Sequence, residues 1–488
     1  MSSISLTKEA FLKAAKPGFR IPVVSTLLAD IETPLSAYWK VAHSEPNSFL
    51  LESVTGGEQV ARYSIIGVRP RCVLTTKNGA AHLTTAGEKE QVEVGDDPLA
   101  ILRELLPRVE ENFAQALPRL CGGAIGFVGY DYVRTIERLP DANPDTLGIP
   151  DVLMMICDSV LVFDHAKNQI QVVALAEGTA DGYAFALEEI GRIQSLLAEP
   201  LPSLPGGEFN SHPVEANLTQ SDFEKIVARC VDYIRAGDVF QVVPSIRFET
   251  RVDAHPVTVY RALRSLNPSP FMFLIRSPGL DIVGASPELL VSLEKRNAGV
   301  RPIAGTRPRG ATPAEDNALA ADLLADEKER AEHLMLIDLG RNDLGRVCQP
   351  GTVQVEDLMV IEKYSHVMHI VSDVVGQLKP ELDGIDLVRA TFPAGTLSGA
   401  PKIRAMEVID EMEPCRRGLY GGAVGSFAAN GDVDLAIAIR TIVIRNGIGY
   451  VQAGAGIVAD SNPTNEYQEC VNKAKAALRA IQIAQRGI

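Results

Sequence analysis

Apolar and polar positions along the chain predict short strands mixed with helices. Before residue 198 the apolar runs predict strands at residues 49–51, 62–68, 124–130 and 152–162, and a helix at 98–111. Proline and glycine then crowd residues 198–216, a composition that neither a helix nor an inner strand tolerates. We therefore predict a linker at 198–216 between a first part, 1–197, and a second part, 217–488.

The second part has the plainer pattern. It predicts helices at residues 217–236 and 312–338, and strands at 238–249, 270–276, 281–293, 365–375, 421–427, 433–444 and 449–458. Asn430-Gly431 and Asn446-Gly447 separate the last three runs as hairpin turns, and Ser461 or Asn462 caps a final helix that has Pro463 in its first turn. The pairings are antiparallel, so the predicted class is α+β.

Composition narrows the class of protein. The chain has 488 residues, 46% of them hydrophobic and 22% charged, as in an ordinary globular protein. The net charge of −15 argues against nucleic-acid binding. Seven scattered cysteines without a Cys-x-x-Cys motif favour a reducing compartment, and we find neither a signal peptide nor a membrane-spanning run. We expect a cytoplasmic enzyme that makes no contact with a membrane.

Two Glu-x-x-Glu pairs are the first candidate chemistry. Glu329 with Glu332, and Glu466 with Glu469, each fall in a predicted helix, where three-residue spacing puts both carboxylates on one face. Two such faces brought together would give the all-oxygen site that Mg²⁺ prefers. For either pair taken alone, a solvated helix face is the better explanation, and the presence of two pairs narrows the difference without removing it.

Glycine-rich turns and basic residues suggest anion binding. Residues 395–402 form a loop that enters a helix, and residues 301–307 form a strand that enters a basic turn. Arg440 lies in an apolar strand, where a guanidinium needs a carboxylate partner from a ligand or from the protein. The amides of 454–456 could approach a ligand or form a bulge, and His369 could be a catalyst or a core residue.

A short repeat leaves a further question open. Gly-Gly-Ala-Ile-Gly at 122–126 resembles Gly-Gly-Ala-Val-Gly at 421–425. The likeness fits either an internal duplication or a chance recurrence of glycine-rich strand entries.

Together these segments resemble the chorismate-utilising enzymes, most closely the anthranilate synthase branch. The resemblance is carried by residues 240–243, 286–290, 301–306, 338–343, 395–402 and 466–473, with a looser match at 50–53 and 62–64. It implies a two-lobed antiparallel β-sheet sandwich with helices on the outside. Residues 1–197 would be the regulatory lobe and 217–488 the catalytic lobe.

Two positions separate the branches of this family. Aminodeoxychorismate synthases usually have Lys where this chain has Ala304, and isochorismate and salicylate synthases usually have a Lys base where it has Gln241. The absence of a lysine at both positions suits an enzyme whose nucleophile is ammonia. The implied reaction converts chorismate and ammonia to anthranilate, pyruvate and water.

The resemblance also assigns roles to residues. It implies Mg²⁺ on Glu332 and Glu469, with Glu329 and Glu466 holding water or orienting the site. It implies Glu288 as the acid for the departing hydroxyl and His369 as a further proton-transfer group. The implied substrate pocket consists of Gly305, Thr306, Thr396, Tyr420, Arg440, Gly454, Ala455, Gly456 and Lys473.

Regulation and a partner complete the expectation. A tryptophan pocket is implied at Glu52, Ser53, Pro270, Phe271 and Met272, although the family often has Tyr at Phe271. A separate glutamine amidotransferase subunit would supply ammonia in a hetero-oligomer. An aminodeoxyisochorismate synthase and an inactive tryptophan sensor stay open as rivals.

Overall fold

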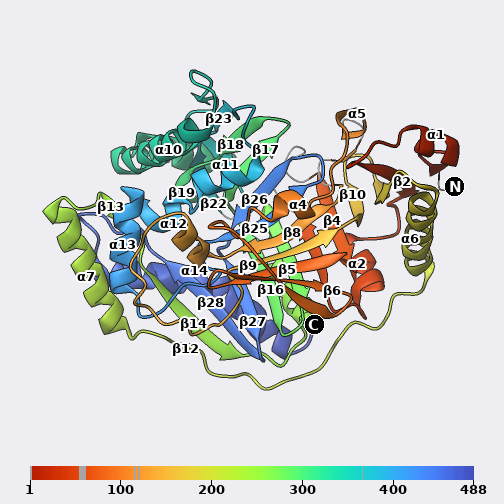
Figure 1. Cartoon of the computed structure of the whole chain (residues 1–488). Coiled ribbons are helices and arrows are strands. Elements are labelled where there is room, and N and C mark those ends of the chain that lie inside the picture. The colour runs from red at the N-terminus through yellow and green to blue at the C-terminus, as the bar shows by residue number, and fades with distance from the viewer. Residues whose placement is uncertain (1–2, 54–61, 115–116, 119–120, 365–366) are drawn as a thin grey trace.

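Two large sheets form the body of the molecule (Figure 1). The computed structural model describes residues 3–53, 62–114, 117–118, 121–364 and 367–488. In spatial order the first sheet consists of β1 (Ser3–Ile4), β2 (Arg20–Leu28), β11 (Gln169–Glu177), β10 (Ser159–Asp164), β4 (Tyr63–Val68), β3 (Ser48–Glu52), β15 (Phe271–Ser277), β16 (Leu280–Ser286), β27 (Thr441–Arg445), β28 (Ile448–Gly454), β14 (Ser245–Arg251) and β12 (Glu215–Ala216).

The second sheet is nearly as wide. It consists of β20 (Gln354–Val355), β23 (Val374–Gln377), β18 (Asn297–Val300), β17 (Leu289–Glu294), β26 (Val433–Ile437), β25 (Ala423–Ala428), β8 (Gly123–Val128), β9 (Val152–Cys157), β5 (Cys72–Lys77), β6 (Ala80–Thr85) and β7 (Glu88–Val92). Two small sheets are β19 (Ile303–Pro308) with β22 (Val367–Val371) and β21 (Val360–Lys363), and β13 (Gln241–Val242) with β24 (Gly399–Ala400).

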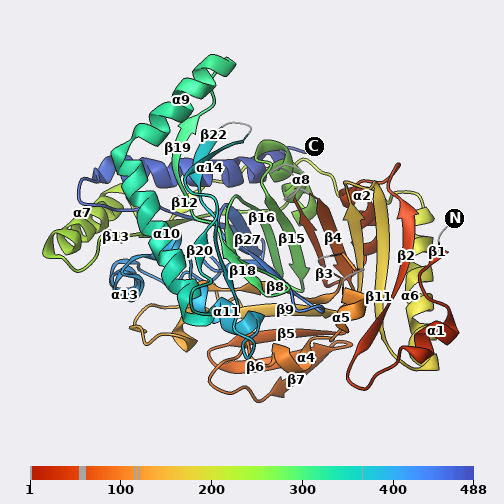
Figure 2. The ribbon, with the colours of Figure 1, turned by 90° about the horizontal axis from the view of Figure 1, so that it is seen from above.

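Helices lie outside the sheets, and α9 projects from the body (Figure 2). They are α1 (Lys8–Lys13), α2 (Pro34–Ala42), α4 (Leu102–Leu105), α5 (Glu111–Ala114), the 3₁₀ helix η1 (Tyr130–Thr135), α6 (Ala180–Ala198), α7 (Gln220–Ala236), α8 (Pro256–Leu266), α9 (Pro313–Ala325), α10 (Glu327–Val347), α11 (Gly384–Thr391), α12 (Gly395–Ser398), α13 (Lys402–Met412) and α14 (Pro463–Gln485).

Three apolar layers hold the sheets and helices together. Phe49 and Phe273 of the first sheet meet Phe127 and Met155 of the second in the core between the sheets. The outer face of the first sheet packs on α2, α6, α8 and α14, and that of the second sheet packs on α10 and α11. The strand pairings are antiparallel, so the predicted α+β class with an antiparallel sandwich is confirmed.

The predicted linker is extended, but the two parts share both sheets. No helix or strand lies between Ala198 and Glu215, and this segment runs along the lower edge of the body in Figure 1. In the first sheet β3 pairs with β15, and in the second β8 pairs with β25. The division into a regulatory and a catalytic lobe stays a prediction.

Several predicted elements are divided in the structure. The runs 152–162, 281–293 and 433–444 each form two strands that belong to different sheets, because the chain crosses from one sheet to the other within the run. The single helix predicted at 312–338 is wrong: Asp326 ends α9 and caps α10 by accepting hydrogen bonds from two amides. Of the helix predicted at 98–111, α4 covers Leu102–Leu105.

Other local predictions are confirmed. Asn446 and Gly447 both have positive φ, as a two-residue hairpin turn requires, and they join β27 to β28. Asn462 caps α14, with Pro463 at its start. The two glycine-rich repeats lie on paired strands, where Gly126 is opposite Gly425.

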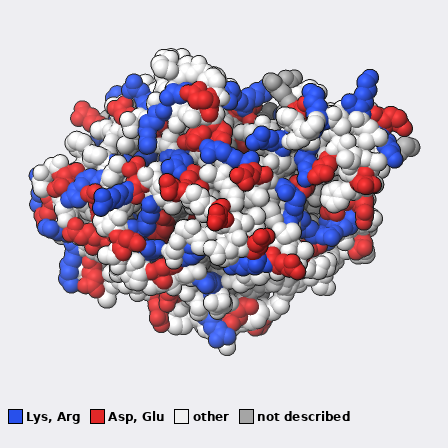
Figure 3. Space-filling model, viewed as in Figure 1, with Lys and Arg blue, Asp and Glu red and all other residues white. Residues whose placement is uncertain are grey.

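Acidic and basic side chains intermingle over the face in Figure 3.

Candidate functional site

Two crossings between the sheets place the central residues of the site. The chain passes from β16 to β17 at Pro287-Glu288, and from β26 to β27 just before Thr441. The crossings lie side by side, since Ile437 N–H donates to the Glu288 carbonyl (3.0 Å) and Ala285 N–H donates to the Arg440 carbonyl (3.2 Å). Arg440 has a φ of 52°, a left-handed conformation that is costly outside glycine and often marks functional positions.

Glu288 is a buried carboxyl group at the first crossing. Burial raises the pKa of Glu288 to about 7, although Thr396, Lys473 and Arg440 each oppose this shift. The Thr396 hydroxyl donates a hydrogen bond of 2.9 Å to Glu288 Oε1. Glu288 can therefore carry a proton near neutral pH, as a general acid must.

Arg440 is the cationic group of the cavity. Within the described residues its guanidinium has no hydrogen bond or ion pair, and burial lowers the pKa of Arg440. It lines an open cavity of about 520 Å³ with Asn465, Gln468, Glu469, Asn472 and Lys473. A half-buried guanidinium without a hydrogen-bond partner favours binding of an anionic group, so this cavity can take a carboxylate.

The two acidic pairs lie on the first two turns of α10 and α14. Burial raises the pKa of Glu329 and of Glu466, and the second carboxylate of each pair adds to the shift. Lys328 interacts electrostatically with Glu332 of the first pair and Glu466 of the second, so both pairs face one region. Lys328 also bonds Asp460, just before α14, at 2.9 Å.

This arrangement fits a metal ion that takes few protein ligands. Among the described residues, no three His, Cys, Asp or Glu side chains are close enough to form a metal site by themselves. Mg²⁺ is commonly held by one or two carboxylates, with water and substrate oxygens completing its shell. Of the two predicted ligands, Glu332 accepts a hydrogen bond from Gln241 and Glu469 is ion-paired with Lys473.

Gln241 lies between the acidic pair on α10 and Gly456. Its Nε2 donates to Glu332 Oε1 at 2.9 Å, and a Cβ added to Gly456 would lie 2.8 Å from this Nε2. Pairing with Ala400 and the hydrogen bonds between Val242 and Ile457 hold its backbone. The sequence distinguished Gln241 from a lysine base but gave no sign of its contact with Glu332.

His369 and its neighbours come from the small sheet of β19, β21 and β22. His369 Nδ1 lies 3.0 Å from Thr306 Oγ1 and 3.2 Å from the Gly305 carbonyl. Since that carbonyl can only accept, a proton on Nδ1 leaves Nε2 as a proton acceptor. Burial lowers the pKa of His369, which favours the neutral ring. A Cβ on Gly305 would lie 3.2 Å from Glu329 Oε2, so this turn approaches the acidic pair.

Lys473 and Tyr420 border the end of β28. Lys473 Nζ bonds Glu469 Oε1 at 2.7 Å and the Gly454 carbonyl at 3.0 Å. A Cβ on Gly454 would lie 2.7 Å from the Tyr420 hydroxyl, so glycine is required for this close approach. Ala455 is fully buried directly after Gly454.

Arg417, which the sequence did not reveal, supports the site from behind. Its side chain is buried and makes a two-pronged ion pair with Glu413, the shortest contact being 2.6 Å. It also donates to the Leu397 carbonyl beside Thr396 (2.7 Å) and to the Val243 carbonyl near Gln241 (2.6 Å). Its guanidinium lies over the Tyr420 ring at 5.4 Å.

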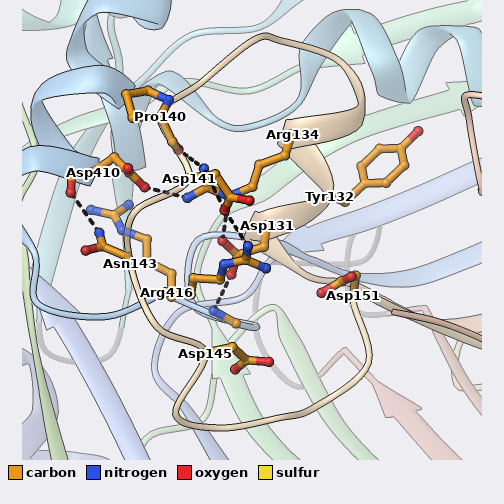
Figure 4. A network of polar contacts seen from close by, with 12 residues as sticks. Asp131, Tyr132, Arg134, Pro140, Asp141, Asn143, Asp145, Asp151, Asp410 and Arg416 are labelled. Atoms are coloured by element: carbon orange, nitrogen blue, oxygen red, sulfur yellow. Dashed lines mark hydrogen bonds and ion pairs between the residues drawn. The ribbon is translucent and has the colours of Figure 1, made fainter. Parts of the chain in front are cut away.

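A polar network fixes the turn that follows Arg417 (Figure 4). Asp131 accepts from Gly418 N–H at 2.8 Å and from Arg134, and Arg134 bonds Asp410 at 2.5 Å. The neighbouring Arg416 bonds Asp141. Residues from the first part of the chain therefore hold the turn that carries Tyr420.

The predicted regulatory residues gather at the pairing of β3 with β15. Met272 lies opposite Glu52, and Pro270, Phe271 and Ser53 adjoin this pair. The Glu52 carboxylate is buried, accepts from Tyr260 and bonds Arg264 at 3.1 and 3.2 Å. The Ser53 hydroxyl is buried without a hydrogen-bond partner in the described residues. The chain that follows, 54–61, lies outside the described residues.

The structure thus joins most predicted residues through short contacts. These link Glu288 with Thr396, His369 with Gly305 and Thr306, Lys473 with Glu469 and Gly454, and Tyr420 with Gly454. A neutral acid, an unpaired cation and two acidic pairs in one region can bind and transform a small carboxylate.

Comparisons with known proteins give one consistent result. The family described as chorismate binding enzyme matches residues 46–479. Anthranilate synthase component 1 of Pseudomonas aeruginosa is 48% identical over 493 residues, covering 99% of this chain and all of the relative. The same-named protein of Mycobacterium tuberculosis is 48% identical over 496 residues, covering 98% and 96%.

Solved structures agree with the sequence relatives. Anthranilate synthase component I of Streptococcus pneumoniae superposes with a TM-score of 0.78 at 42% identity, covering 86% of this chain and 92% of that one. The isochorismate synthase MenF of Escherichia coli, at 17% identity and a TM-score of 0.71, shares the fold over 97% of both chains. In the described part of the chain no helix is long and apolar enough to span a membrane.

Proposed function

The chain belongs to the anthranilate synthase component I family of chorismate-binding enzymes, and from this membership we propose how its residues carry out the reaction. Anthranilate synthase is a lyase that converts chorismate and ammonia to anthranilate, pyruvate and water. The residues must therefore orient a flexible dicarboxylate, help a hydroxyl leave and later move a proton. Fixing both carboxylates removes much of the entropic cost of this reaction.

Arg440 holds the enolpyruvyl carboxylate in this proposal. Its unpaired, half-buried guanidinium in the open cavity is the observation that carries the proposal. The amides of 454–456 and the Tyr420 hydroxyl, which lies against Gly454, complete the contact. Gly305, Thr306 and Thr396 line the remainder of the pocket, and Lys473 orients Glu469.

Glu332 and Glu469 would hold Mg²⁺, with Glu329 and Glu466 orienting water beside them. The ion would neutralise the ring carboxylate of chorismate and fix its position. The proposal is supported by the approach of the two acidic pairs and by the Gln241 contact that orients Glu332.

Two groups move protons. Glu288, with its pKa of about 7, donates a proton to the hydroxyl that leaves C4 as ammonia adds at C2. His369 is neutral and can accept a proton at Nε2, which suits the later removal of the C2 proton that accompanies loss of pyruvate.

A direct assay tests this function. The purified chain is given chorismate, Mg²⁺ and ammonium at alkaline pH, and anthranilate fluorescence and pyruvate are followed together. We expect equal amounts of both products and their loss with EDTA. Chorismate consumed without pyruvate would instead identify an aminodeoxyisochorismate synthase, and no consumption with tryptophan binding intact would favour the sensor.

A partner and an inhibitor belong to the same proposal. A glutamine amidotransferase subunit supplies ammonia in a hetero-oligomer, so glutamine should replace ammonium when that subunit is added. Tryptophan binds where Met272 lies opposite Glu52, with apolar Phe271 and Pro270 for the indole and Ser53 for the amino acid end. The seven free, buried cysteines suit the reducing cytoplasm.

A further inference from the structure

A second cavity borders Glu288 and shares no lining residue with the open cavity at Arg440. Its volume is about 50 Å³, and its walls include the polar side chains of Glu288, Thr396 and Asp343. A buried water needs roughly 15 Å³ of such space and at least two polar partners, so the cavity has room for about three waters. The cavity also reaches Leu339, which is half-buried, so it extends from Glu288 towards the surface of the molecule.

Two carboxyl groups of this cavity each keep one oxygen without a hydrogen bond from the described residues. Thr396 donates only to Oε1 of Glu288. Lys402 donates only to Oδ2 of Asp343, at 2.7 Å. The remaining Oε2 and Oδ1 are not sealed from water, in contrast to the buried Oε1 of Gln241. Water in the cavity can therefore contact both carboxyl groups.

The proposed reaction leaves Glu288 short of one proton in every turnover. Glu288 gives its proton to the C4 hydroxyl, which leaves as water when the C4–O bond breaks. The ammonia nitrogen forms the C2–N bond with its lone pair, becomes positively charged and releases one proton to solvent. The proton that His369 takes from C2 goes to the departing enolpyruvate, which becomes pyruvate. The reaction therefore consumes no proton overall, but one must travel from solvent back to Glu288.

We propose that the second cavity holds a chain of waters that returns this proton to Glu288, with Asp343 as a further proton-carrying group of the chain; this inference rests on the proposed function. Bound substrate occupies the Arg440 side, so Glu288 needs a separate path to regain its proton. In each transfer a water gives one proton to the Glu288 carboxylate and takes one from the next water or from Asp343. Burial raises the pKa of Asp343 although Lys402 opposes the shift, which brings its proton affinity nearer to that of Glu288.

Rapid-mixing kinetics of two variants test the proposal. Asp343→Asn keeps the size of the side chain and an oxygen for Lys402, but its amide cannot take up a proton near neutral pH. Leu339→Trp places a larger side chain in the cavity wall and displaces the waters. Each enzyme is equilibrated about one pH unit below the pKa of Glu288, so that this group starts protonated. It is then mixed with chorismate, Mg²⁺ and ammonium chloride, and anthranilate fluorescence is followed from the first turnover.

Both variants should form the first anthranilate quickly and all later ones slowly. The first turnover uses a proton that is already on Glu288, so its rate constant should stay within about twofold of that of the unmodified chain. Later turnovers wait for the proton, so the steady-state rate should fall at least about tenfold after a burst of about one anthranilate per site. Imidazole buffer should restore the steady-state rate of Asp343→Asn, since a small acid can replace the lost group.

Leu334→Trp is the matched control. Leu334 lies on α10 like Leu339, but it is 47% exposed and does not line the cavity. This variant should show neither a burst nor a slower steady state. Thermal unfolding and chorismate binding establish that each variant is folded.

Two results would overturn the inference. An unchanged steady-state rate in either variant would mean that Glu288 regains its proton from the reacting side, for example from the ammonium group of the intermediate. Equal slowing of the first and the later turnovers would mean that Asp343 and Leu339 only support the fold. Glu288→Gln and the unmodified chain keep the two proposals apart. Full activity of Glu288→Gln would refute the acid itself, and failure of the unmodified chain to form anthranilate would refute the proposed function.

Discussion

Single residues in this site owe their protonation states to burial. Burial raises the pKa of Glu288 to about 7, so a large fraction of this carboxyl group is protonated at neutral pH, and burial lowers the pKa of His369, which favours its neutral ring. One buried acid and one neutral base thus lie in the same site. This separation suits a reaction that first donates a proton to an oxygen and later removes one from carbon.

The pH profile of Thr396→Val tests the assignment of Glu288. With free ammonia held constant, kcat/KM for chorismate should fall as pH rises through about 7, because Glu288 loses its proton. The Thr396 hydrogen bond favours ionised Glu288, so removing it should move this limb upward by about half to one pH unit. A downward shift, or none, would exclude Glu288 as the acid.

Glu332→Gln tests the metal assignment. Replacing a proposed ligand charge by an amide should lower Mg²⁺-dependent turnover by at least about 100-fold while tryptophan binding stays measurable. Glu327→Gln is the matched control, because Glu327 is an exposed residue on the first turn of the same helix. Full turnover by Glu332→Gln would mean that the ion is held elsewhere.

At the scale of elements, local turns and helix caps could be predicted from the sequence, but the points where the chain crosses from one sheet to the other could not. The turns at Asn430-Gly431 and Asn446-Gly447, the Asn462 cap and the strand at Phe271–Ser277 could all be predicted, because each depends on neighbouring residues. Apolar runs do not reveal which sheet a strand joins, so 281–293 and 433–444 looked continuous. Glu288 and Arg440 lie at the two crossings that the apolar pattern did not reveal. The expectation that these two residues share a site rested on the family resemblance.

Long-range contacts could not be predicted from the sequence either. Arg417 reaches carbonyl groups 20 and 174 residues away, and Gln241 reaches Glu332 across 91 residues. No spacing rule links such positions. Candidate substrate-binding residues could thus be proposed from the sequence, whereas the contacts that hold them in place required the fold.

Arg417→Met tests the support that this buried side chain gives to three neighbouring segments. Breaking the pair with Glu413 should cost about 3–5 kcal/mol of unfolding free energy, since it leaves a buried carboxylate without a partner. It should also lower kcat/KM for chorismate by about 100-fold, because the Thr396, Gln241 and Tyr420 segments lose a shared anchor.

The control for Arg417→Met is another buried pair, and a conservative variant adds a second comparison. Lys40 bonds Glu32 at 2.5 Å with side chains 10% and 12% exposed, and its other hydrogen bond goes to the Leu197 carbonyl rather than to a residue proposed to bind chorismate. Lys40→Met should destabilise the fold and leave the kinetics unchanged. Arg417→Lys should recover part of the activity. Equal kinetic losses in both methionine variants would reduce Arg417 to a purely structural role.

At the scale of the whole molecule, both parts of the chain contribute strands to each of the two large sheets. β3 and β4 of the first part lie between β10 and β15, and β8 of the first part pairs with β25 of the second. The proposed tryptophan residues at Met272 and Glu52 lie on the pair β3–β15, and β15 is joined by a hairpin to β16, which leads directly to Glu288. Inhibitor and substrate would thus share one continuous sheet.

Cutting the linker tests whether the two parts are separable. The segment at Gly206-Gly207 is exposed, although it is tied nearby by Thr258 donating to the Pro205 carbonyl and by Phe209 N–H donating to the Gln485 carbonyl. A protease site inserted there should be cleaved without loss of activity beyond about twofold, because surface loops tolerate nicking. The pieces should elute together and unfold in one cooperative transition, since the apolar core between the sheets contains residues from both parts. Separation in native buffer, or two transitions, would mean that each part has a core of its own, whatever the sheet pairing suggests.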